Sequence, residues 1–527
     1  MAKPRIMFYH DGRHPLIYMY EPPMQAEEYE AAVDELVGTP IEAIMFCLGD
    51  GRTVLHDSKV GELWGHNVDR WHHLIFRRAH QNARHLIESG HDPLRIICDR
   101  AHAKGMLVYP TLLVQQGSGQ RGTDVRCSDF RFDNTDLEIG AAGDCPPDFP
   151  GRSGLDFKHE EVRDERFALI EETLNGYHVD GFELNLNYTP YYFHPNEVEA
   201  GRDVMTGWIE RVHDAVKASG TQRELAVRVP GSLDACDQVG LDVRRWIERG
   251  LVDVVIGQRP TGSELLDQMT DFRPLVEVAK GSACRVHAAL ESFVDSDRIA
   301  DGTIQMIRAA ACNYWAQGID GLYISQWFGN WPYGAEFYEK LRELPHPDIM
   351  AARDKIYFVP TETSAPSSPK DGRPLPAPME VGRPTRVAFH ISDDLQRWHS
   401  AGRIHEVLLR VRVNNVSELD QIDFALNGKP LPADRLRRIN QMYRMRAPRY
   451  RVNCTYWYVF DLDPTLWPQT GSNTLEVTLQ QRDSGLTQPV ALRDVELQIQ
   501  YLMGKSFHRG LDPDLGPSES KRILNPH

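Results

Sequence analysis

Short apolar runs alternate with longer amphipathic stretches from the N-terminus to about residue 345. Strands that alternate with helices in this way form a parallel sheet, and eight such units close a (β/α)8 barrel. The predicted strands are residues 5–10, 41–48, 105–114, 179–187, 224–230, 251–257, 285–292 and 319–328. The predicted helices are residues 26–37, 71–88, 93–104, 160–176, 198–218, 238–249, 263–280 and 298–316. We therefore predict an α/β fold with a TIM barrel over residues 1–350. An open doubly wound sheet is the alternative, although no GxGxxG turn follows the first strand.

A Pro- and Ser-rich segment, "VPTETSAPSSPKDGRPLPAPMEVGRP", follows the barrel and is typical of a linker. Residues 351–384 are predicted to form this linker. Alternating runs beyond it predict a β-sandwich or jelly roll over residues 385–505. Residues 506–527 are predicted to be a C-terminal tail. Since a linker of this kind implies few obligatory contacts, the barrel and the β-domain should fold separately.

Composition excludes several classes of partner. The net charge of −16 repels phosphate backbones and anionic lipids, so we expect no nucleic acid and no membrane as partners. The N-terminus "MAKPRIMFYHDG" has no signal-like apolar segment, which predicts a cytoplasmic protein, or a secreted one if a leader has been removed. The eight cysteines show no CxxC or metal-binding spacing, so we read them as reduced and mostly buried. We expect no cofactor.

The fourth predicted strand, "VDGFELNLNY", carries polar residues on one face. Glu183, Asn185 and Asn187 alternate with Phe182 and apolar leucines. In a barrel the apolar side meets the helices, so the polar side should line a site at the carboxyl end of the strands. The alternative is that Glu183 pairs with an arginine inside the barrel, because a buried carboxylate needs a partner.

The seventh strand repeats the pattern, because His287 and Glu291 share a face in "RVHAALES". Two carboxylates at a barrel mouth suit glycoside hydrolysis, in which one acts as acid/base and the other as nucleophile. We predict Glu183 as the general acid/base and Glu291 as the nucleophile or second carboxylate.

Other side chains at strand ends are predicted to bind the substrate. They are His10, Asp11, Asp50, Asn185, Asn187, Tyr188, Arg228, Gln258, His287, Gln326, Trp327 and Trp331. The tryptophans offer flat faces for sugar stacking. The group of His10, Asp11 and Asp50 suits sugar hydroxyls or a divalent cation, and the spacing does not choose between them. Two long connections, residues 49–69 and 115–158, should lie over the same end of the barrel. The histidines of the "WHHLIFRRAH" region are read as a helix face and not as a metal site.

Two segments carry a resemblance to a known group. "NGYHVDGFELNLNYTPYYF" and "RAAACNYWAQGIDGLYISQWFG" resemble bacterial barrel proteins related to the glycosyl hydrolase-like family 10 group, over residues 5 to about 345. This resemblance implies a glycosidase. In the large clan of retaining barrel glycosidases the acid/base ends strand four and the nucleophile ends strand seven, which is similar to Glu183 and Glu291. Phe182 stands where that clan has Asn. Against the DGxDxDxE pattern of family 18 chitinases, Asn187 takes the place of the catalytic acid.

The sequence therefore predicts a carbohydrate-active enzyme, a glycoside hydrolase acting on an oligosaccharide or polysaccharide substrate. One alternative is a lyase or dehydratase on acidic sugars, with His287 or Tyr188 removing a proton and Arg228 binding a carboxylate. Another is a non-catalytic sugar-binding protein, suggested by Asn185 and Asn187 at positions where acids are common. Assembly as a homo-oligomer is left open.

Overall fold

The chain folds into two compact units in a computed structural model. The structure describes residues 3–14, 16, 20–116, 119–259, 265–294, 296, 299–327, 331–361, 374–441, 445–446, 450–451 and 455–505. The first unit comprises Met1–Leu265, Thr270–Ser292 and Gln317–Pro345, and the second comprises Leu266–Met269, Phe293–Ala316 and His346–His527. The chain therefore passes between the two units several times.

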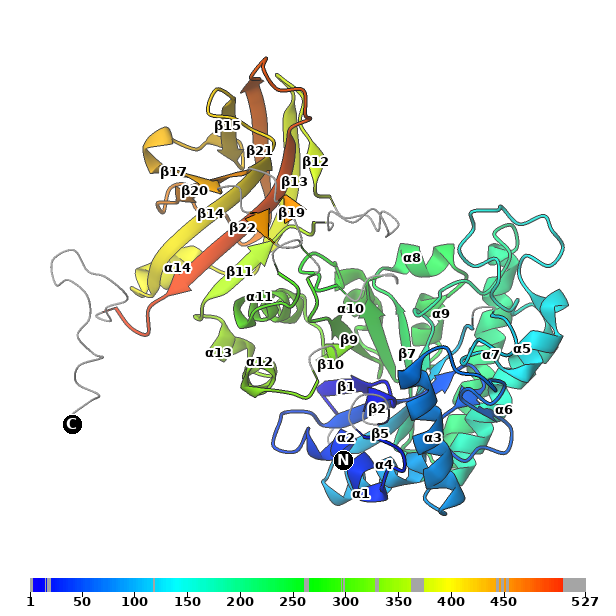
Figure 1. Cartoon of the computed structure of the whole chain (residues 1–527). Helices are drawn as coiled ribbons and strands as arrows, with labels where there is room; N and C mark the ends of the chain where they lie inside the picture. The colour runs from blue at the N-terminus through cyan, green and yellow to red at the C-terminus, as the bar shows by residue number, and fades with distance from the viewer. Residues whose placement is uncertain are drawn as a thin grey trace. The chain divides into compact units, whose positions relative to one another are not determined.

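Eight parallel strands close into a barrel in the first unit, which confirms the predicted fold class and the predicted strands (Figure 1). In chain order they are β1 (Ile6–His10), β2 (Ala43–Asp50), β5 (Leu107–Leu113), β6 (Gly181–Asn185), β7 (Glu224–Pro230), β8 (Val254–Gln258), β9 (Arg285–Leu290) and β10 (Gly321–Ile324). Pairing of β1 with both β2 and β10 closes the ring.

Helices follow most of these strands. They are α1 (Ala26–Tyr29), α2 (Ala31–Asp34), α3 (Leu74–Glu88), α4 (Pro93–Ala103), α6 (Glu160–Gly176), α7 (Val198–Ser219), α8 (Leu233–Gln238), α9 (Val243–Glu248), α10 (Arg273–Ala279) and α12 (Ala335–Glu343). The helix predicted over 238–249 is wrong at its start, because Gly240 has φ +81° and separates α8 from α9. The helix predicted over 263–280 begins only at Arg273, because Leu266–Met269 belongs to the second unit.

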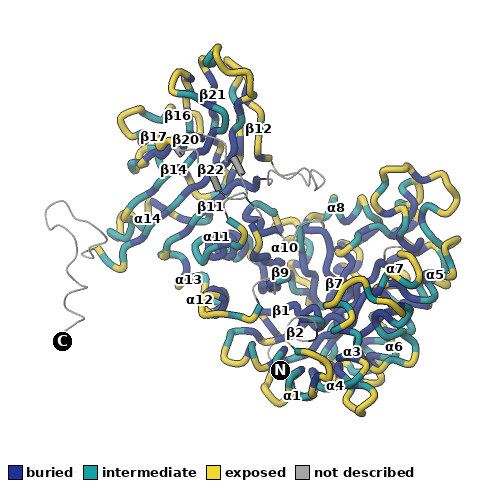
Figure 2. Tube along the Cα trace, viewed as in Figure 1, coloured by how far each residue is buried: buried dark blue, intermediate teal, exposed yellow. Residues whose placement is uncertain are grey.

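The interior of the barrel is filled by side chains. Tyr109 and His287 are each accommodated by a glycine on a neighbouring strand. A Cβ at Gly181 would lie 2.3 Å from the Tyr109 ring, and a Cβ at Gly321 would lie 2.4 Å from the His287 ring. Burial along the strands is nearly continuous (Figure 2). Only residues above this packed interior, at the carboxyl ends of the strands, can therefore meet a substrate.

The second unit contains two antiparallel sheets around one apolar core, which confirms the predicted β-sandwich. One sheet contains β11 (Lys355–Phe358), β12 (Ala377–Pro378), β14 (Ile404–Asn414), β17 (Leu436–Gln441), β20 (Thr455–Asp461) and β22 (Ala491–Tyr501). The other contains β13 (Pro384–Ile391), β15 (Gln421–Leu426), β16 (Lys429–Pro430) and β21 (Gly471–Gln481). A short pair, β18 (Met445–Arg446) and β19 (Tyr450–Arg451), stands apart.

Segments that precede the predicted sandwich, residues 385–505, also belong to the second unit. They are Leu266–Met269, α11 (Ile304–Trp315), α13 (Pro347–Met350) and β11. Gln268 donates to the carbonyls of Met306 and Ile356 at 2.9 and 3.0 Å, and Asn313 donates to the carbonyl of His390 at 3.0 Å.

Strands β11 and β12 lie within the predicted linker, so that segment is partly structured. Lys355 in β11 forms a fully buried ion pair with Asp393 at 2.9 Å. Two short stretches of the predicted linker thus belong to a sheet of the sandwich, and the predicted boundaries stay predictions. The predicted tail, residues 506–527, lies outside the described residues.

Candidate active site

Glu183 lies in the middle of the barrel interior with its side chain fully buried. Arg228 Nε donates to Glu183 Oε1 at 2.8 Å, and Thr111 Oγ1 donates to Oε2 at 2.5 Å. The Tyr323 hydroxyl lies 3.1 and 3.0 Å from the two carboxylate oxygens. Both carboxylate oxygens of Glu183 thus have protein partners. This arrangement matches the alternative interpretation of the sequence, in which Glu183 pairs with an arginine inside the barrel.

Arg228 is held between two aromatic rings in the same layer. Its guanidinium carbon lies 4.6 Å from the ring centroids of both Tyr9 and Tyr323. Burial alone would lower the pKa of Arg228, but the Glu183 carboxylate outweighs it and raises that pKa above its ordinary value. The arginine predicted to bind substrate is therefore a structural counter-ion with 1% exposure.

His287 lies opposite Gly321 on β10, further below the mouth of the barrel than Glu183. It is fully buried, and among the described residues neither ring nitrogen has a hydrogen-bond partner. Burial lowers the pKa of His287 to about 3, so the ring is neutral. This position does not favour a role as substrate ligand or base, because inward-facing Ala289 lies between His287 and Glu291, the residue that reaches the mouth.

Four polar residues form a connected network at the mouth of the barrel. Gln258, the last residue of β8, donates to Glu291 Oε1 at 2.6 Å and to Ser325 Oγ at 3.2 Å. Asn187 donates to Gln258 Oε1 at 3.1 Å. We call this group the mouth network. The mouth network joins residues at the carboxyl ends of β6, β8, β9 and β10. It brings the predicted binding residues Asn187 and Gln258 together with the predicted catalytic carboxylate of Glu291.

The segment after β6 completes this part of the mouth. Asn185 Oδ1 accepts the backbone N–H groups of Asn187 and Tyr188 at 3.1 and 3.0 Å, which turns the chain over the barrel. Asn187 Oδ1 is buried and, within the described residues, has no hydrogen-bond partner. Tyr188 is 40% exposed beside it. An unused amide acceptor beside an exposed aromatic ring suits a sugar hydroxyl and a sugar face.

Asp50 faces the mouth because β2 contains a bulge. Strict alternation from Cys47 would turn Asp50 outward, but the register shifts between them, and Asp50 lies opposite inward-facing Leu113. Gly49 permits the bulge, since it has φ +150° and a Cβ there would lie 1.9 Å from a backbone oxygen. Burial raises the pKa of Tyr188, and the negative charge of Asp50 adds to that shift.

Asp11 and Asp50 share a cation at the ends of β1 and β2. Arg13 lies 3.3 Å from Asp11 Oδ2 and 3.4 Å from Asp50 Oδ2, while His14 Nδ1 lies 2.6 Å from Asp11 Oδ1. Burial would raise the pKa of Asp11, but the hydrogen bond with His14 and the charge of Arg13 hold it well below its ordinary range. Asp11 is therefore an anion near neutral pH and no proton donor. Neither Arg13 nor His14 was predicted.

His10 lies on the other side of β1, away from the barrel interior. Its ring stacks on Phe46 at 5.4 Å, and its Nδ1 accepts the N–H of Gly12 at 3.0 Å. Its Nε2 lies 3.8 Å from Glu35 Oε1, and Trp331 Nε1 donates to Glu35 Oε2 at 2.5 Å. His10 and Trp331 thus meet around a carboxylate that sequence patterns did not indicate, because Glu35 caps the end of the short helix α2 and both partners lie in other segments.

Burial raises the pKa of Glu35 from 4.5 to about 7, although the hydrogen bond from Trp331 opposes this shift. A carboxyl group whose pKa is raised by folding stabilises the folded state as long as it is protonated. This contribution is fully present below the pKa of the unfolded state and is lost as the pH rises through 7. Relative to a Glu35→Gln variant, the wild type should lose about 3 kcal/mol of folding stability between pH 4.5 and 7.5. Urea unfolding of both proteins at several pH values measures this, and parallel pH profiles would contradict it.

Trp327 and Gln326 follow β10. Trp327 is 3% exposed and donates from Nε1 to the carbonyl of Leu290 at 2.9 Å, so its ring is part of the core. Gln326 has φ +51°, a left-handed conformation that turns the chain after β10. Of the residues predicted to bind sugar, Asn185, Asn187, Tyr188, Gln258, Asp11 and Asp50 lie at the mouth. His10, Arg228, His287 and Trp327 do not.

The two long connections contact each other. Gly65 donates to the carbonyl of Val125 at 2.8 Å, and Thr53 Oγ1 donates to that of Arg126 at 2.6 Å. They contain β3 (Thr53–Val54), β4 (Glu62–Leu63) and α5 (Asp129–Asp133). Since Gln116 Nε2 donates to the carbonyl of Asp50 at 3.0 Å, the second connection is also tied to the mouth.

No group of three or more His, Cys, Asp or Glu side chains in the described ranges is arranged to hold a metal ion. The cysteines of the described ranges are buried free thiols, and Cys454 lies outside those ranges. No described helix is long and apolar enough to cross a membrane.

Comparisons with known proteins give only distant likenesses. No family model and no curated protein matches the chain, so the resemblance to the glycosyl hydrolase-like family 10 group stays a prediction. Among solved structures, a cycloisomaltooligosaccharide glucanotransferase of Paenibacillus sp. matches with 11% identity and a TM-score of 0.37, over 93% of this chain and 57% of that one. α-L-Fucosidase isoenzyme 2 of Paenibacillus thiaminolyticus matches with 12% identity and a TM-score of 0.41, over 66% and 50%.

A β-galactosidase of Marinomonas ef1 matches with 11% identity and a TM-score of 0.41, over 66% of this chain and 59% of that one. This chain therefore covers only 50–59% of the length of these three proteins. All three act on carbohydrates by name. At TM-scores below 0.5, however, the likenesses carry no argument about activity, which has to come from the site itself.

Proposed function

We propose that the protein is a glycoside hydrolase that acts on an oligosaccharide or polysaccharide at the mouth of its barrel. The observation that carries this proposal is the mouth network, in which Glu291 is held by Gln258 at 2.6 Å beside Asn187 and exposed Tyr188. Fixed amides and an aromatic face suit sugar hydroxyls, and a positioned carboxylate suits attack on, or proton transfer at, a glycosidic bond.

Glu291 is the proposed reacting carboxylate, and Asp50 is its proposed partner. Asp50 faces the mouth through the bulge in β2, and its side-chain contacts with Arg13 at 3.4 Å and Trp64 at 3.3 Å both involve Oδ2. Glu183 was the sequence-based choice for acid/base. Its two oxygens are engaged by three protein groups below the mouth, so we propose that it positions Arg228 and does not exchange protons with substrate.

Release of reducing ends from a panel of neutral and acidic glycans tests the proposal. Hydrolysis of at least one glycan, with no rise in the ultraviolet absorbance of unsaturated uronates, is the expected result. A rise in that absorbance would instead establish the lyase alternative. Saturable binding of a glycan without any turnover would establish the non-catalytic alternative, for which Asn185 and Asn187 were the sequence argument.

A further inference from the structure

A hollow of about 400 Å³ lies on the outer face of the larger sheet of the sandwich. Its lining includes Arg410 on β14, Arg437 and Ile439 on β17, and Val459 on β20, all of which belong to the second unit. This volume falls in the range of about 300–1,000 Å³ that is usual for ligand sites. We call it the sandwich hollow. None of the described residues that line it belongs to the mouth network.

Two arginines of the sandwich hollow flank one valine. Val459 pairs with Arg410 on one side and with Arg437 on the other. The sequence neighbours Leu409 and Phe460 point into the apolar core, so Arg410 and Val459 point away from it. Since neighbouring strands lie about 4.8 Å apart, the backbones of the two arginines are roughly 10 Å apart across Val459. An anion above Val459 is therefore within reach of both guanidinium groups.

Arg437 carries an uncompensated charge. It is exposed, and among the described residues no carboxylate lies within ion-pair distance of it and no side-chain hydrogen bond holds it. Arg410 Nη1 lies 3.5 Å from Glu496 Oε2, and the Arg410 side chain is 31% exposed. Burial lowers the pKa of Arg410 and the positive charge of Arg437 lowers it further, although Asp494 opposes both effects. An anion between the two cations would relieve their repulsion.

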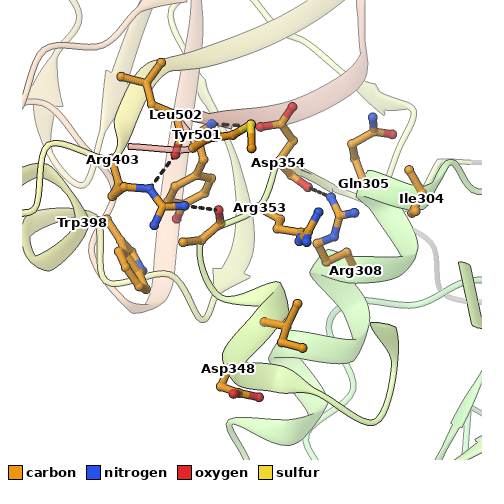
Figure 3. A pocket seen from close by; sticks show the side chains of 13 residues that line it. Ile304, Gln305, Arg308, Asp348, Arg353, Asp354, Trp398, Arg403, Tyr501 and Leu502 are labelled. Atoms are coloured by element: carbon orange, nitrogen blue, oxygen red, sulfur yellow. Dashed lines mark hydrogen bonds between the residues drawn. The ribbon is translucent and has the colours of Figure 1, made fainter. Parts of the chain in front are cut away.

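Arginines elsewhere in this unit are engaged differently. A cavity of about 550 Å³ is lined by residues of α11, of α14 (Leu395–Ser400) and of the end of β22 (Figure 3). There, Arg308 and Arg403 each donate to a backbone carbonyl at 2.5 Å, so the protein already occupies some of their donors. The side-chain donors of Arg437 have no such acceptor in the described part of the chain, and they are available to a ligand.

The sequence around β17 is strongly basic. The whole chain has a net charge of −16, yet no Asp or Glu occurs from Leu436 to Phe460. A basic run of this kind attracts polyanions. The arginines of this part of the sequence are Arg435, Arg437, Arg438, Arg444, Arg446, Arg449 and Arg451.

We propose that the sandwich hollow binds an acidic polysaccharide, with a carboxylate or sulfate group above Val459 between Arg410 and Arg437. Planar guanidinium groups bind such oxyanions through paired N–H donors. Ile439, which is 42% exposed in the same lining, offers an apolar contact to the face of a sugar ring. The second unit would thereby hold an acidic glycan to the protein.

A glycan is favoured over a nucleic acid for two reasons. Duplex DNA carries one charge per about 1.7 Å of its axis, so a chain with a net charge of −16 repels it strongly. A polyuronate carries one charge per sugar unit and is repelled less. The second reason rests on the proposed function, since a glycoside hydrolase gains from a separate site that retains its substrate.

Affinity electrophoresis of the full chain, in gels that contain a soluble polymer, tests this proposal. Polygalacturonate or dextran sulfate should retard the protein, and uncharged dextran should not. Whichever polyanion binds more tightly identifies the anionic group. Retardation should fall as salt is added, because the contacts are ionic. Retardation by duplex DNA at an equal or lower concentration would assign the sandwich hollow to nucleic acid and overturn the proposal.

Arg437→Gln should raise the Kd for the polyanion on the order of tenfold, with an unchanged melting temperature, because the side chain is exposed and lacks contacts within the described residues. Arg437→Lys keeps the charge and should lose less affinity. Arg386→Gln is the matched control. Arg386 lies on β13 in the other sheet, its side chain is 66% exposed, and it pairs with Glu476 at 2.8 Å. This variant should bind as the wild type does.

The proposal is overturned if neither polyanion retards the protein, or if uncharged dextran retards it as strongly. Unchanged binding in folded Arg437→Gln also overturns it, and would leave Arg437 as a charge that protects the edge strand β17. Failure here is distinct from failure of the proposed function. Hydrolysis without this binding removes the sandwich hollow alone, and binding without hydrolysis of any glycan removes the hydrolase alone.

Discussion

Replacing Glu291 with Gln is expected to lower kcat/KM roughly 10²- to 10⁴-fold on whichever glycan the wild type hydrolyses. The amide keeps the shape of the side chain and can still accept the hydrogen bond from Gln258, but it neither attacks nor exchanges a proton. Folding stability should therefore change little. Steady-state kinetics and a thermal melt of the same preparation measure both effects.

Glu277→Gln is the matched control for this experiment. Glu277 lies on α10 of the same unit, its side chain is 75% exposed, and Lys280 lies 3.6 Å away. It should retain wild-type kinetics. If the mechanism is retaining, azide should partly restore activity to Glu291→Ala by entering the vacated space. Wild-type turnover in Glu291→Gln would remove Glu291 from the mechanism, and Asp50→Asn then becomes the decisive variant.

Replacing Glu183 with Gln is expected to lower the free energy of unfolding by about 3–5 kcal/mol, the usual cost of breaking a buried ion pair. The variant leaves the Arg228 charge inside the barrel without its anion, and it also disturbs the contacts of Thr111 and Tyr323. Urea unfolding followed by circular dichroism measures the loss.

The double variant Glu183→Leu/Arg228→Met separates charge from packing. Since it removes both ions and roughly keeps their volume, it should be more stable than Glu183→Gln. An exposed pair provides the control: Asp203→Asn, which breaks the Arg245–Asp203 contact at 2.6 Å, should cost at most about 1 kcal/mol. Unchanged stability of Glu183→Gln, together with loss of turnover, would return Glu183 to the acid/base role that the sequence indicated.

Periodicity in the sequence was sufficient to predict the barrel, because every barrel strand is a buried apolar run between helices. It also predicted that Glu183 faces inward. It could not predict that Glu183 lies below the mouth with its carboxylate already hydrogen-bonded, since the partners Arg228 and Tyr323 come from other strands.

Two further features, one at the mouth and one on the outer side of β1, escaped the sequence for a similar reason. A one-residue shift in β2 reverses the direction of Asp50, and a strict period of two cannot reveal such a bulge. Glu35 is marked only by long-range contacts with His10 and Trp331. Local pattern thus indicates the facing direction of a residue, whereas function depends on which groups from distant segments fill the space around it.

The division of the chain between its two units has a consequence for synthesis. Helix α11 leaves the ribosome before β10, but Ala309 in this helix packs in a core whose other members extend to Tyr501 near the C-terminus. Until β22 has been translated, the nascent chain must carry the apolar face of this helix without its final neighbours. A newly made polypeptide that already contains every barrel strand is therefore still a client for chaperones, and premature termination within the sandwich should yield a product that is degraded.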